Sequence, residues 1–207
     1  MSIEKAYNSW AKLYDTNENK TRDLDKKSTK ATLTKYTFDH VLELGCGTGK
    51  NTEWLLTKAK TIIGFDFSQE MLALAKAKVT DGKVTFKKAD LTRPWDVKNE
   101  CADLITCSLT LEHIKDLHFI FDQAYKKLKP NGIFFISELH PFKQYAGSKA
   151  RFESENGIEE LEVYTHHSSE YVSSAQNNGF KLEEIDEWFD CLDENEIPRL
   201  ISFVFKK

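Results

Sequence analysis

Three glycines at alternate positions, Gly45, Gly47 and Gly49, follow a short apolar run in this chain of 207 residues. Without a Cβ atom, such glycines let the backbone turn sharply and let a ligand lie directly against main-chain N–H groups. A helix expected after the loop would direct the positive end of its dipole at the same place. The pattern therefore predicts a loop that binds a nucleotide-like ligand.

Three carboxylates stand at the ends of apolar runs in the same part of the chain. Glu43 precedes the first glycine, Asp66 lies near the end of the next apolar run, and Asp90 follows the run after that. In open α/β sheets, ligands bind beyond the carboxyl ends of the strands. We therefore expect Asp66 to lie beside the glycine loop, where a carboxylate can accept hydrogen bonds from two ribose hydroxyls.

The residues around the loop indicate which kind of nucleotide it binds. A dinucleotide fingerprint has the form G-x-G-x-x-G, whereas the third glycine here falls two residues after the second. Lys50 and Asn51 after the loop also depart from the Gly-Lys-Ser/Thr of a phosphate-binding loop. Glu43 would repel a phosphate and attract an ammonium group. The expected ligand carries a positive charge rather than phosphates.

Alternating strand and helix patterns must position these residues. Strands are predicted over residues 41–44, 61–67, 84–88, 102–108, 133–138, 182–189 and 199–206, and helices over 3–13, 24–36, 52–58, 69–79, 117–128 and 168–177. Ser68 is a suitable N-cap for the helix over 69–79. From residue 38 onward the alternation favours βαβ units with a parallel sheet.

The first 37 residues are polar and rich in lysine. Tyr7, Trp10 and Tyr14 have a near-helical spacing, which predicts an amphipathic helix. These aromatic side chains either pack onto the domain or belong to a lid over the ligand. Residues 15–25 are expected to be mobile, and the following helix has a weak apolar face that includes Leu33.

Composition narrows the possible partners and compartment. The chain suits a single domain, and its formal net charge of −4 with interspersed signs gives no basic field for nucleic acid. No segment approaches the roughly 18 consecutive apolar residues of a membrane span. The first residues show no charged-then-apolar signal pattern. We expect a cytoplasmic protein with a small-molecule substrate and without a nucleic-acid or membrane partner.

The cysteines fit the same compartment. They are Cys46, Cys101, Cys107 and Cys191, widely spaced and without a CxxC pair. Histidines at zinc-ligand spacing are also missing from the sequence, so no metal site is expected. Small buried thiols in a reducing compartment account for this distribution.

Five motifs in fixed order resemble those of the class I S-adenosylmethionine-dependent methyltransferases. They are Glu43 to Gly49, Asp66, Ala89-Asp90, Leu111-Glu112-His113-Ile114 and Leu128 to Gly132, and the resemblance covers roughly residues 38–138. It implies S-adenosylmethionine as the cofactor and S-adenosylhomocysteine as the product. It also implies an α/β fold, a Rossmann-like three-layer sandwich with a seven-stranded, mostly parallel sheet and an antiparallel last strand.

The resemblance further implies roles for individual residues. The loop from Gly45 would lie against the methionyl part of the cofactor, Asp66 would bind the ribose hydroxyls, and Asp90 would bind the adenine amino group. The expected cofactor-binding residues are Tyr14, Glu43, Gly45, Cys46, Gly47, Gly49, Asp66, Phe67, Met71, Asp90, Leu91 and Ser108. The aromatic lead-in from Tyr7 to Tyr14 resembles the segment that covers the cofactor in this family.

Methyl transfer from a sulfonium is an in-line displacement, so a base is needed only if the acceptor must lose a proton. The side chains able to act as that base near neutral pH are His113, His140, His166 and His167, and the main candidates are His140 and His113. His140 is favoured because it directly follows a strand and Pro141 fixes the chain there. The alternatives are a pocket-wall role for His140 and a structural or cofactor-side role for His113.

The segment from His140 to Phe152 places aromatic residues among three cations, which suits a small planar or carboxylate-bearing acceptor. A solvated loop is the alternative. The expected substrate-binding residues are Tyr7, Trp10, Tyr14, His113, His140, Tyr145, Arg151 and His166. For His166, a solvent-facing position before a helix is the alternative.

Together these patterns predict one methyltransferase domain. Its expected parts are an N-terminal helical lid (1–37), a cofactor-binding core (38–138), a substrate-cap insertion (139–167) and a C-terminal helix with a strand pair (168–207). The predicted activity is methyl transfer to an O, N or S atom of a small molecule, by a monomer or a homodimer. The rival interpretations are a protein or RNA methyltransferase and a non-catalytic module that binds S-adenosylmethionine.

Overall fold

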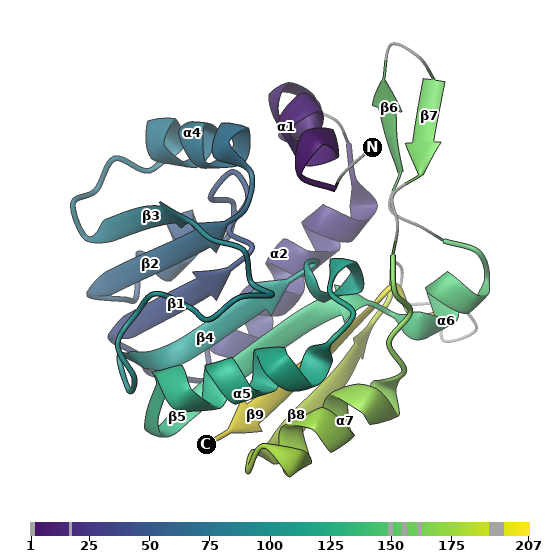
Figure 1. The fold of residues 1–207 in the computed structure, drawn as a ribbon. Helices are drawn as coiled ribbons and strands as arrows, with labels where there is room; N and C mark the ends of the chain where they lie inside the picture. Colours follow the sequence, from purple (N-terminus) through teal and green to yellow (C-terminus); the bar gives the residue numbers. More distant parts are fainter. Residues whose placement is uncertain (1–2, 17, 149–150, 155–156, 161–162, 191–196) are drawn as a thin grey trace.

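Seven strands form the main sheet of the computed structural model, which describes residues 3–16, 18–148, 151–154, 157–160, 163–190 and 197–207. Their order is β3-β2-β1-β4-β5-β9-β8 (Figure 1). The strands are β1 (His40–Leu44), β2 (Thr61–Asp66), β3 (Val84–Lys88), β4 (Ala102–Ser108), β5 (Leu128–Leu139), β8 (Lys181–Trp188) and β9 (Leu200–Lys206). A separate hairpin consists of β6 (Arg151–Ser154) and β7 (Gly157–Glu160).

The strand directions confirm the expected fold class. The pairs β1–β2, β2–β3, β1–β4 and β4–β5 are parallel, whereas β9 is antiparallel to both of its neighbours, β5 and β8. Along the chain the order runs outward from β1 through β2 to β3 and then resumes on the other side with β4. The boundary between β1 and β4 is therefore the switch point where open α/β sheets bind ligands.

Helices cover both faces of the sheet. The helices are α1 (Ile3–Tyr14), α2 (Lys20–Leu33), α3 (Thr52–Leu55), α4 (Gln69–Lys78), α5 (Leu117–Lys127), α6 (Pro141–Tyr145) and α7 (Ser168–Asn177), with a 3-10 turn η1 (Leu111–His113). In Figure 1, α5 and α7 lie in front of the sheet and α2 lies behind it. Among the described residues, every helix is too short or too polar to cross a membrane.

Alternate strand residues supply the two cores. The face toward α5 and α7 packs around the phenyl rings of Phe121, Phe134 and Phe205, and the face toward α2 and α3 packs around Leu33 and Phe135. Because both faces are covered, the central strands are almost continuously apolar, which is the pattern that predicts a buried parallel sheet. Ser68 caps α4 as expected, since its Oγ atom accepts a hydrogen bond from Met71 N at 3.1 Å.

The second helix differs from its prediction. It begins at Lys20, inside the stretch expected to be mobile, because the Asn19 side chain accepts a hydrogen bond from Arg22 N at 3.0 Å and caps the helix. The buried face of α2 is mostly polar, with Arg22, Asp25, Ser28, Thr29 and Thr32 on it. Apolar periodicity alone therefore predicts a start for this helix that is too late in the chain.

The predicted cap insertion is more regular than its polar sequence indicated. After the short helix α6, the chain forms the β6–β7 hairpin, in which Arg151 pairs with Glu160 and Ser154 pairs with Gly157. Figure 1 shows this hairpin projecting away from the main sheet on the side of α1. It adds a separate structural unit between β5 and α7.

The aromatic core gives a test of this packing. Phe121 is fully buried, with ring centroids 5.3 Å from those of Phe134 and Phe205. We expect Phe121→Ala to lower the free energy of unfolding by about 3–5 kcal/mol in urea denaturation, because it leaves a cavity. Phe142→Ala is the matched control, since Phe142 is 52% exposed and should change stability by about 0.5 kcal/mol or less. Equal effects of the two variants would contradict the assigned core.

Candidate active site

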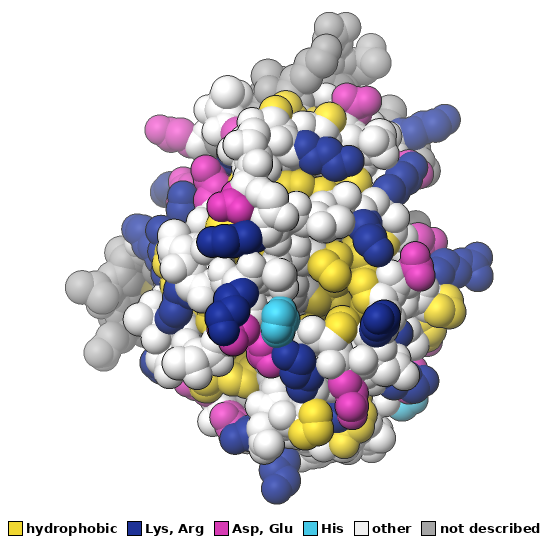
Figure 2. All heavy atoms as spheres, turned by 90° about the vertical axis from the view of Figure 1, so that its left-hand side faces the viewer, with side chains coloured by type: hydrophobic (Ala, Val, Ile, Leu, Met, Phe, Trp, Pro, Cys, Tyr) yellow, Lys and Arg dark blue, Asp and Glu magenta, His cyan; other side chains and the backbone are white. Residues whose placement is uncertain are grey.

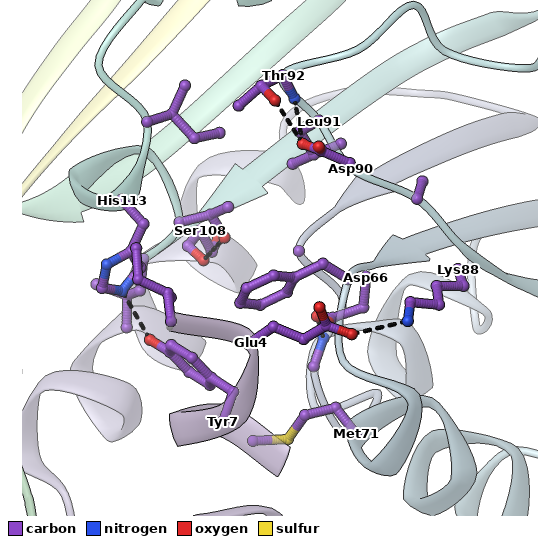
Figure 3. Close-up of a pocket in the computed structure, with 18 of the residues that line it drawn as sticks. Glu4, Tyr7, Asp66, Met71, Lys88, Asp90, Leu91, Thr92, Ser108 and His113 are labelled. Carbon is purple, nitrogen blue, oxygen red and sulfur yellow. Dashed lines mark hydrogen bonds and ion pairs between the residues drawn. The ribbon is translucent and has the colours of Figure 1, made fainter. Parts of the chain in front are cut away.

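A cavity of about 470 Å³ lies beyond the carboxyl ends of β1, β2, β3 and β4. Figure 3 shows side chains around it from α1, from α4, from the ends of β2, β3 and β4, and from the segments after β3 and β4. The lining residues are Ile3, Glu4, Tyr7, Tyr14, Gly45, Gly47, Asp66, Phe67, Met71, Lys88, Ala89, Asp90, Leu91, Thr92, Ser108, Leu109, Thr110, His113 and Ile114. The volume is typical of a small-molecule site.

The glycine loop turns at the floor of this cavity. Gly45 has φ +66°, and a Cβ atom built there would lie 2.1 Å from Oγ1 of Thr110, so a side chain is excluded. At Gly47 a Cβ atom would meet no atom of the described residues within 4 Å, which leaves its backbone open to a ligand. Gly49 lines no cavity described here and packs closely against α4. Its expected contact with the cofactor stays a prediction.

Asp66 ties the end of β2 to the glycine loop. Its Oδ2 atom accepts a hydrogen bond from Gly47 N and its Oδ1 atom accepts one from Ser68 N, both at 2.8 Å. Burial raises the pKa of this carboxyl, and the backbone N–H donors oppose that rise. The carboxylate is therefore held in one orientation at the cavity wall, where the sequence predicted a group that binds hydroxyls.

A second, smaller cavity of about 40 Å³ shares Tyr14, Gly45, Gly47, Ser108 and Leu109 with the first. The sequence analysis assigned Glu43 and Cys46 to the cofactor, and both line this smaller space. Burial raises the pKa of the Cys46 thiol, which leaves it unreactive.

Two carboxyl groups, those of Asp25 and Glu43, line the smaller cavity. Burial raises the pKa of Glu43 to about 8, although Thr52 Oγ1 donates a hydrogen bond to it at 2.5 Å. Asp25 also has a raised pKa because of burial. Within the described residues, Oδ1 of Asp25 and Oγ1 of Thr106 are buried without a hydrogen-bond partner. Such atoms fit a ligand that brings a charged donor group, and a lone ammonium matches this chemistry.

Two cations balance these carboxylates at the same cavity. Arg22 and Lys50 both line it, and the Arg22 guanidinium lies 4.2 Å from the centroid of the Tyr14 ring. A guanidinium beside an aromatic ring interacts with its electron-rich face, and guanidinium groups are well suited to binding carboxylates. The smaller cavity therefore combines anionic and cationic groups, which suits the two charges of an amino acid moiety.

Helix α1 closes the larger cavity from one side. Glu4 pairs with Lys88 at 2.7 Å, and Asn8 Oδ1 accepts a hydrogen bond from Ser68 Oγ at 2.6 Å. Farther along, Asp15 pairs with Lys78 at 2.5 Å. These bonds connect α1 to the strand and helix that carry the cofactor-side residues. Tyr7 and Tyr14 of the aromatic lead-in line the cavity, and a lid role for this segment stays a prediction.

Tyr7 and His113 meet at the cavity wall, as Figure 3 shows. Tyr7 Oη lies 2.8 Å from His113 Nε2, and their ring planes are nearly perpendicular. Glu112 Oε1 lies 3.9 Å from the same nitrogen, and burial raises the pKa of this carboxyl to about 7. The sequence singled out both Tyr7 and His113, but the contact between them joins residues 106 positions apart and has no sequence signal.

His140, the favoured base in the sequence, does not line the cavity. It is 2% exposed, and its Nδ1 atom accepts a hydrogen bond from Phe142 N at 3.1 Å, which caps α6. Its Nε2 atom lies 3.1 Å from Glu187 Oε1. Burial lowers the pKa of this imidazole, and Glu187 opposes the shift. With both ring nitrogens in such contacts, the geometry supports a capping role and gives no support to catalysis.

Other predicted substrate residues also lie away from the cavity. Trp10 packs on Tyr7 and Tyr14 without lining it. Tyr145 is 54% exposed and hydrogen-bonds His167. His166 is buried, contrary to the solvent-facing alternative, and its Nε2 atom donates to the Ile114 carbonyl at 2.8 Å. The side chain of Arg151 lies outside the described part of the chain.

Several lining residues were not among the predicted site residues. They are Ile3, Glu4, Lys88, Ala89, Thr92, Leu109, Thr110 and Ile114 in the larger cavity and Arg22, Asp25, Leu44, Thr48, Lys50, Asn51 and Thr106 in the smaller one. Arg22 and Asp25 are three positions apart in α2 and so share a face of the helix. The Asn19 cap was the available signal for that helix.

Residues 42–136 match the model of a methyltransferase domain. The malonyl-[acyl-carrier protein] O-methyltransferase of Priestia megaterium is 30% identical over 159 residues, which are 71% of this chain and 57% of that protein. The ubiquinone biosynthesis O-methyltransferase of Pelagibacter ubique is 29% identical over 165 residues, 75% of this chain and 67% of that protein. These matches support the predicted assignment to the class I S-adenosylmethionine-dependent methyltransferases.

Solved methyltransferase structures have the same fold. An S-adenosylmethionine-dependent methyltransferase from Mesorhizobium loti superposes with a TM-score of 0.75 at 20% identity, over 89% of this chain and 98% of that one. The N-methyltransferase NodS from Bradyrhizobium japonicum, in complex with S-adenosylhomocysteine, gives 0.68 at 14% identity, over 92% of this chain and 89% of that one. The match to the Priestia protein spans little more than half of that protein's length.

The raised pKa of Glu43 predicts that cofactor binding by this protein depends on pH. With a pKa of about 8, the unliganded carboxyl is largely protonated at pH 7, and a cation beside it favours the ionised form. Binding of S-adenosylhomocysteine should therefore release protons and tighten as the pH rises toward 8. Calorimetry in buffers of different ionisation enthalpy measures this release.

Glu43→Gln is the control for that measurement, because the amide still accepts a hydrogen bond from Thr52 but cannot titrate. We expect the variant to release up to about one proton fewer than the wild type. Identical proton release by the two proteins would show that Glu43 does not sense the bound cation.

Proposed function

We propose that the protein transfers the methyl group of S-adenosylmethionine to a hydroxyl group of a small molecule. The observation that carries this proposal is the Tyr7–His113 pair in the wall of a cavity that α1 closes. It places a proton acceptor beside a space large enough for small ligands. The proposal extends the family assignment from the cofactor to the acceptor.

The residues of both cavities fit the parts of the cofactor. Glu43 and Asp25 would face its ammonium group, and Arg22 would face its carboxylate. Asp66 would bind the ribose hydroxyls, and Phe67, Met71, Asp90 and Leu91 would surround the adenine. When bound, the cofactor supplies an electrophilic methyl group on a sulfonium sulfur.

The protein's own residues then perform three tasks. Helix α1 covers the cavity and excludes water from it. Tyr7 orients the His113 ring through the hydrogen bond at Nε2. In the tautomer whose Nε2–H donates to Tyr7 Oη, His113 takes the proton of the acceptor hydroxyl at Nδ1, since an imidazole is a suitable base near neutral pH. Glu112, 3.9 Å from Nε2, stabilises the imidazolium that forms.

Three observations support a small hydroxyl-bearing acceptor over a polynucleotide. The Pelagibacter relative is named as a ubiquinone biosynthesis O-methyltransferase. The bonds from Glu4, Asn8 and Asp15 hold α1 across the cavity. The formal net charge is −4, and Figure 2 shows basic and acidic side chains interspersed on one face rather than a basic field.

The cysteines indicate the cellular compartment of the protein. Cys46, Cys101 and Cys107 are free thiols, which persist in a reducing compartment, and Cys191 lies outside the described residues. We therefore place the protein in the cytoplasm as part of this proposal, as a monomer or a homodimer.

A screen for methylated products tests the proposal. The protein is incubated with S-adenosylmethionine and separate pools of metabolites, peptides and RNA, and mass spectrometry follows a gain of about 14 Da, the mass of a CH₂ group. A product in the metabolite pool is expected. A product only in the peptide or RNA pool would overturn the small-molecule acceptor. Tight cofactor binding with no product in any pool would identify a non-catalytic module.

Two substitutions test the base at the cavity wall. His113→Gln should lower kcat for the acceptor identified in the screen by about 10²–10⁴-fold, because it removes the proton acceptor. Tyr7→Phe should lower kcat less, because the ring loses its orienting hydrogen bond but keeps its base. Both variants should bind S-adenosylhomocysteine within a few-fold of the wild type in calorimetry.

Tyr145→Phe is the control for these variants, because it also removes a hydroxyl that bonds a histidine but lies outside the cavity. Its kcat should match that of the wild type. If His113→Gln retains full turnover with an acceptor that must lose a proton, the base is another group.

A further inference from the structure

The backbone between β4 and η1 is strained where it passes both cavities. Leu109 has φ +51°, a conformation that residues with a side chain rarely adopt. Leu109 lines both the larger and the smaller cavity. Beside it, Ser108 also lines both cavities, and Thr110 lines the larger one. Strain of this kind persists only where the surrounding structure holds the residue in place.

Two residues near the end of β5 hold Leu109 and the two residues after it in place. Leu109 N donates to the Ser137 carbonyl at 2.9 Å. Thr110 N and Leu111 N, the next two donors, both donate to Oε1 of Glu138 at 2.9 Å. Three consecutive N–H groups of the turn are therefore bound by two consecutive residues of the neighbouring strand.

Glu138 has the environment of a dedicated acceptor. It is 1% exposed, and among the described residues its Oε2 atom has no hydrogen-bond partner. Burial raises the pKa of this carboxyl to about 8, against the two N–H donors. The carboxyl group is thus buried where its charged form is disfavoured, while its Oε1 atom accepts hydrogen bonds from the turn. Burying such a group is costly unless its hydrogen bonds compensate.

The turn that Glu138 binds positions two parts of the site. Oγ1 of Thr110 occupies the space where a side chain at Gly45 would lie, so the turn packs directly on the glycine loop. His113 N donates to the Thr110 carbonyl at 3.1 Å, which fixes the histidine relative to the same turn. A shift of residues 109–111 would therefore move the loop contact and His113 together.

We propose that Glu138 is a positioning residue that holds the strained turn at Leu109 in its ligand-binding conformation. Its acceptor oxygen is the functional feature and its charge is dispensable. The link to His113 rests on the proposed function, whereas the link to the glycine loop concerns cofactor binding alone. The effect can therefore be measured without knowing the acceptor.

The experiment is a mutant cycle with S-adenosylhomocysteine as the probe. Glu138→Leu removes the acceptor and should weaken binding about tenfold or more in calorimetry, because two buried N–H groups lose their partner and the turn relaxes. Glu138→Gln keeps an oxygen in the same position and should bind within about threefold of the wild type. The Tm of each unliganded variant is measured alongside to confirm folding.

Leu109→Gly provides the second arm of the cycle. Glycine adopts positive φ without strain, so the turn keeps its conformation without the clamp. The loss caused by Glu138→Leu should therefore be at least about threefold smaller in the L109G background than in the wild type, and the difference is the coupling between the two positions.

Three outcomes would overturn the proposal. The first is an equal loss from Glu138→Gln and Glu138→Leu, which would assign the effect to charge. The second is the same loss from Glu138→Leu with and without Leu109→Gly, which would exclude relief of strain. The third is a lower Tm with unchanged affinity, which would leave Glu138 a core residue. A wild type that does not bind the probe would instead overturn the proposed function.

Discussion

Buried carboxylates at the carboxyl edge of the sheet must find hydrogen-bond donors, and the loops around the site are arranged by that need. Asp66 receives N–H groups from Gly47 and Ser68, and Glu138 receives them from the turn after β4. Each carboxylate begins on one strand and binds the loop of a neighbour. The shape of the cavity thus follows from a few hydrogen bonds to buried carboxyl oxygens in a low-dielectric region.

The strands and the glycine loop were predictable because their signals are local. A parallel strand covered on both faces is an almost continuous apolar run, and each such run here ends in a residue of the site. The start of α2 was missed for a physical reason. Its buried face carries Arg22, Asp25 and Thr29 rather than an apolar stripe, and the Asn51 side chain donates a hydrogen bond to Asp25.

For the site as well, residues in local motifs were easier to predict than isolated residues. Residues inside a contiguous motif, such as Gly45, Asp66 and Asp90, lie at the larger cavity as expected. His140 was predicted only from its position after a strand, and it caps α6 instead of lining the cavity. The pairing of Tyr7 with His113 depends on how α1 crosses the sheet edge, and no single segment encodes that crossing.

The β6–β7 hairpin has a consequence for how this protein can diversify. Its strands pair with each other and not with the main sheet, and it stands between β5 and α7. Changes in its length or sequence leave the register of β5 against β9, and with it the carboxyl edge of the sheet, unaltered. Selection can therefore remodel this hairpin while the carboxyl edge of the sheet stays constant, so the two parts of the chain can evolve at different rates.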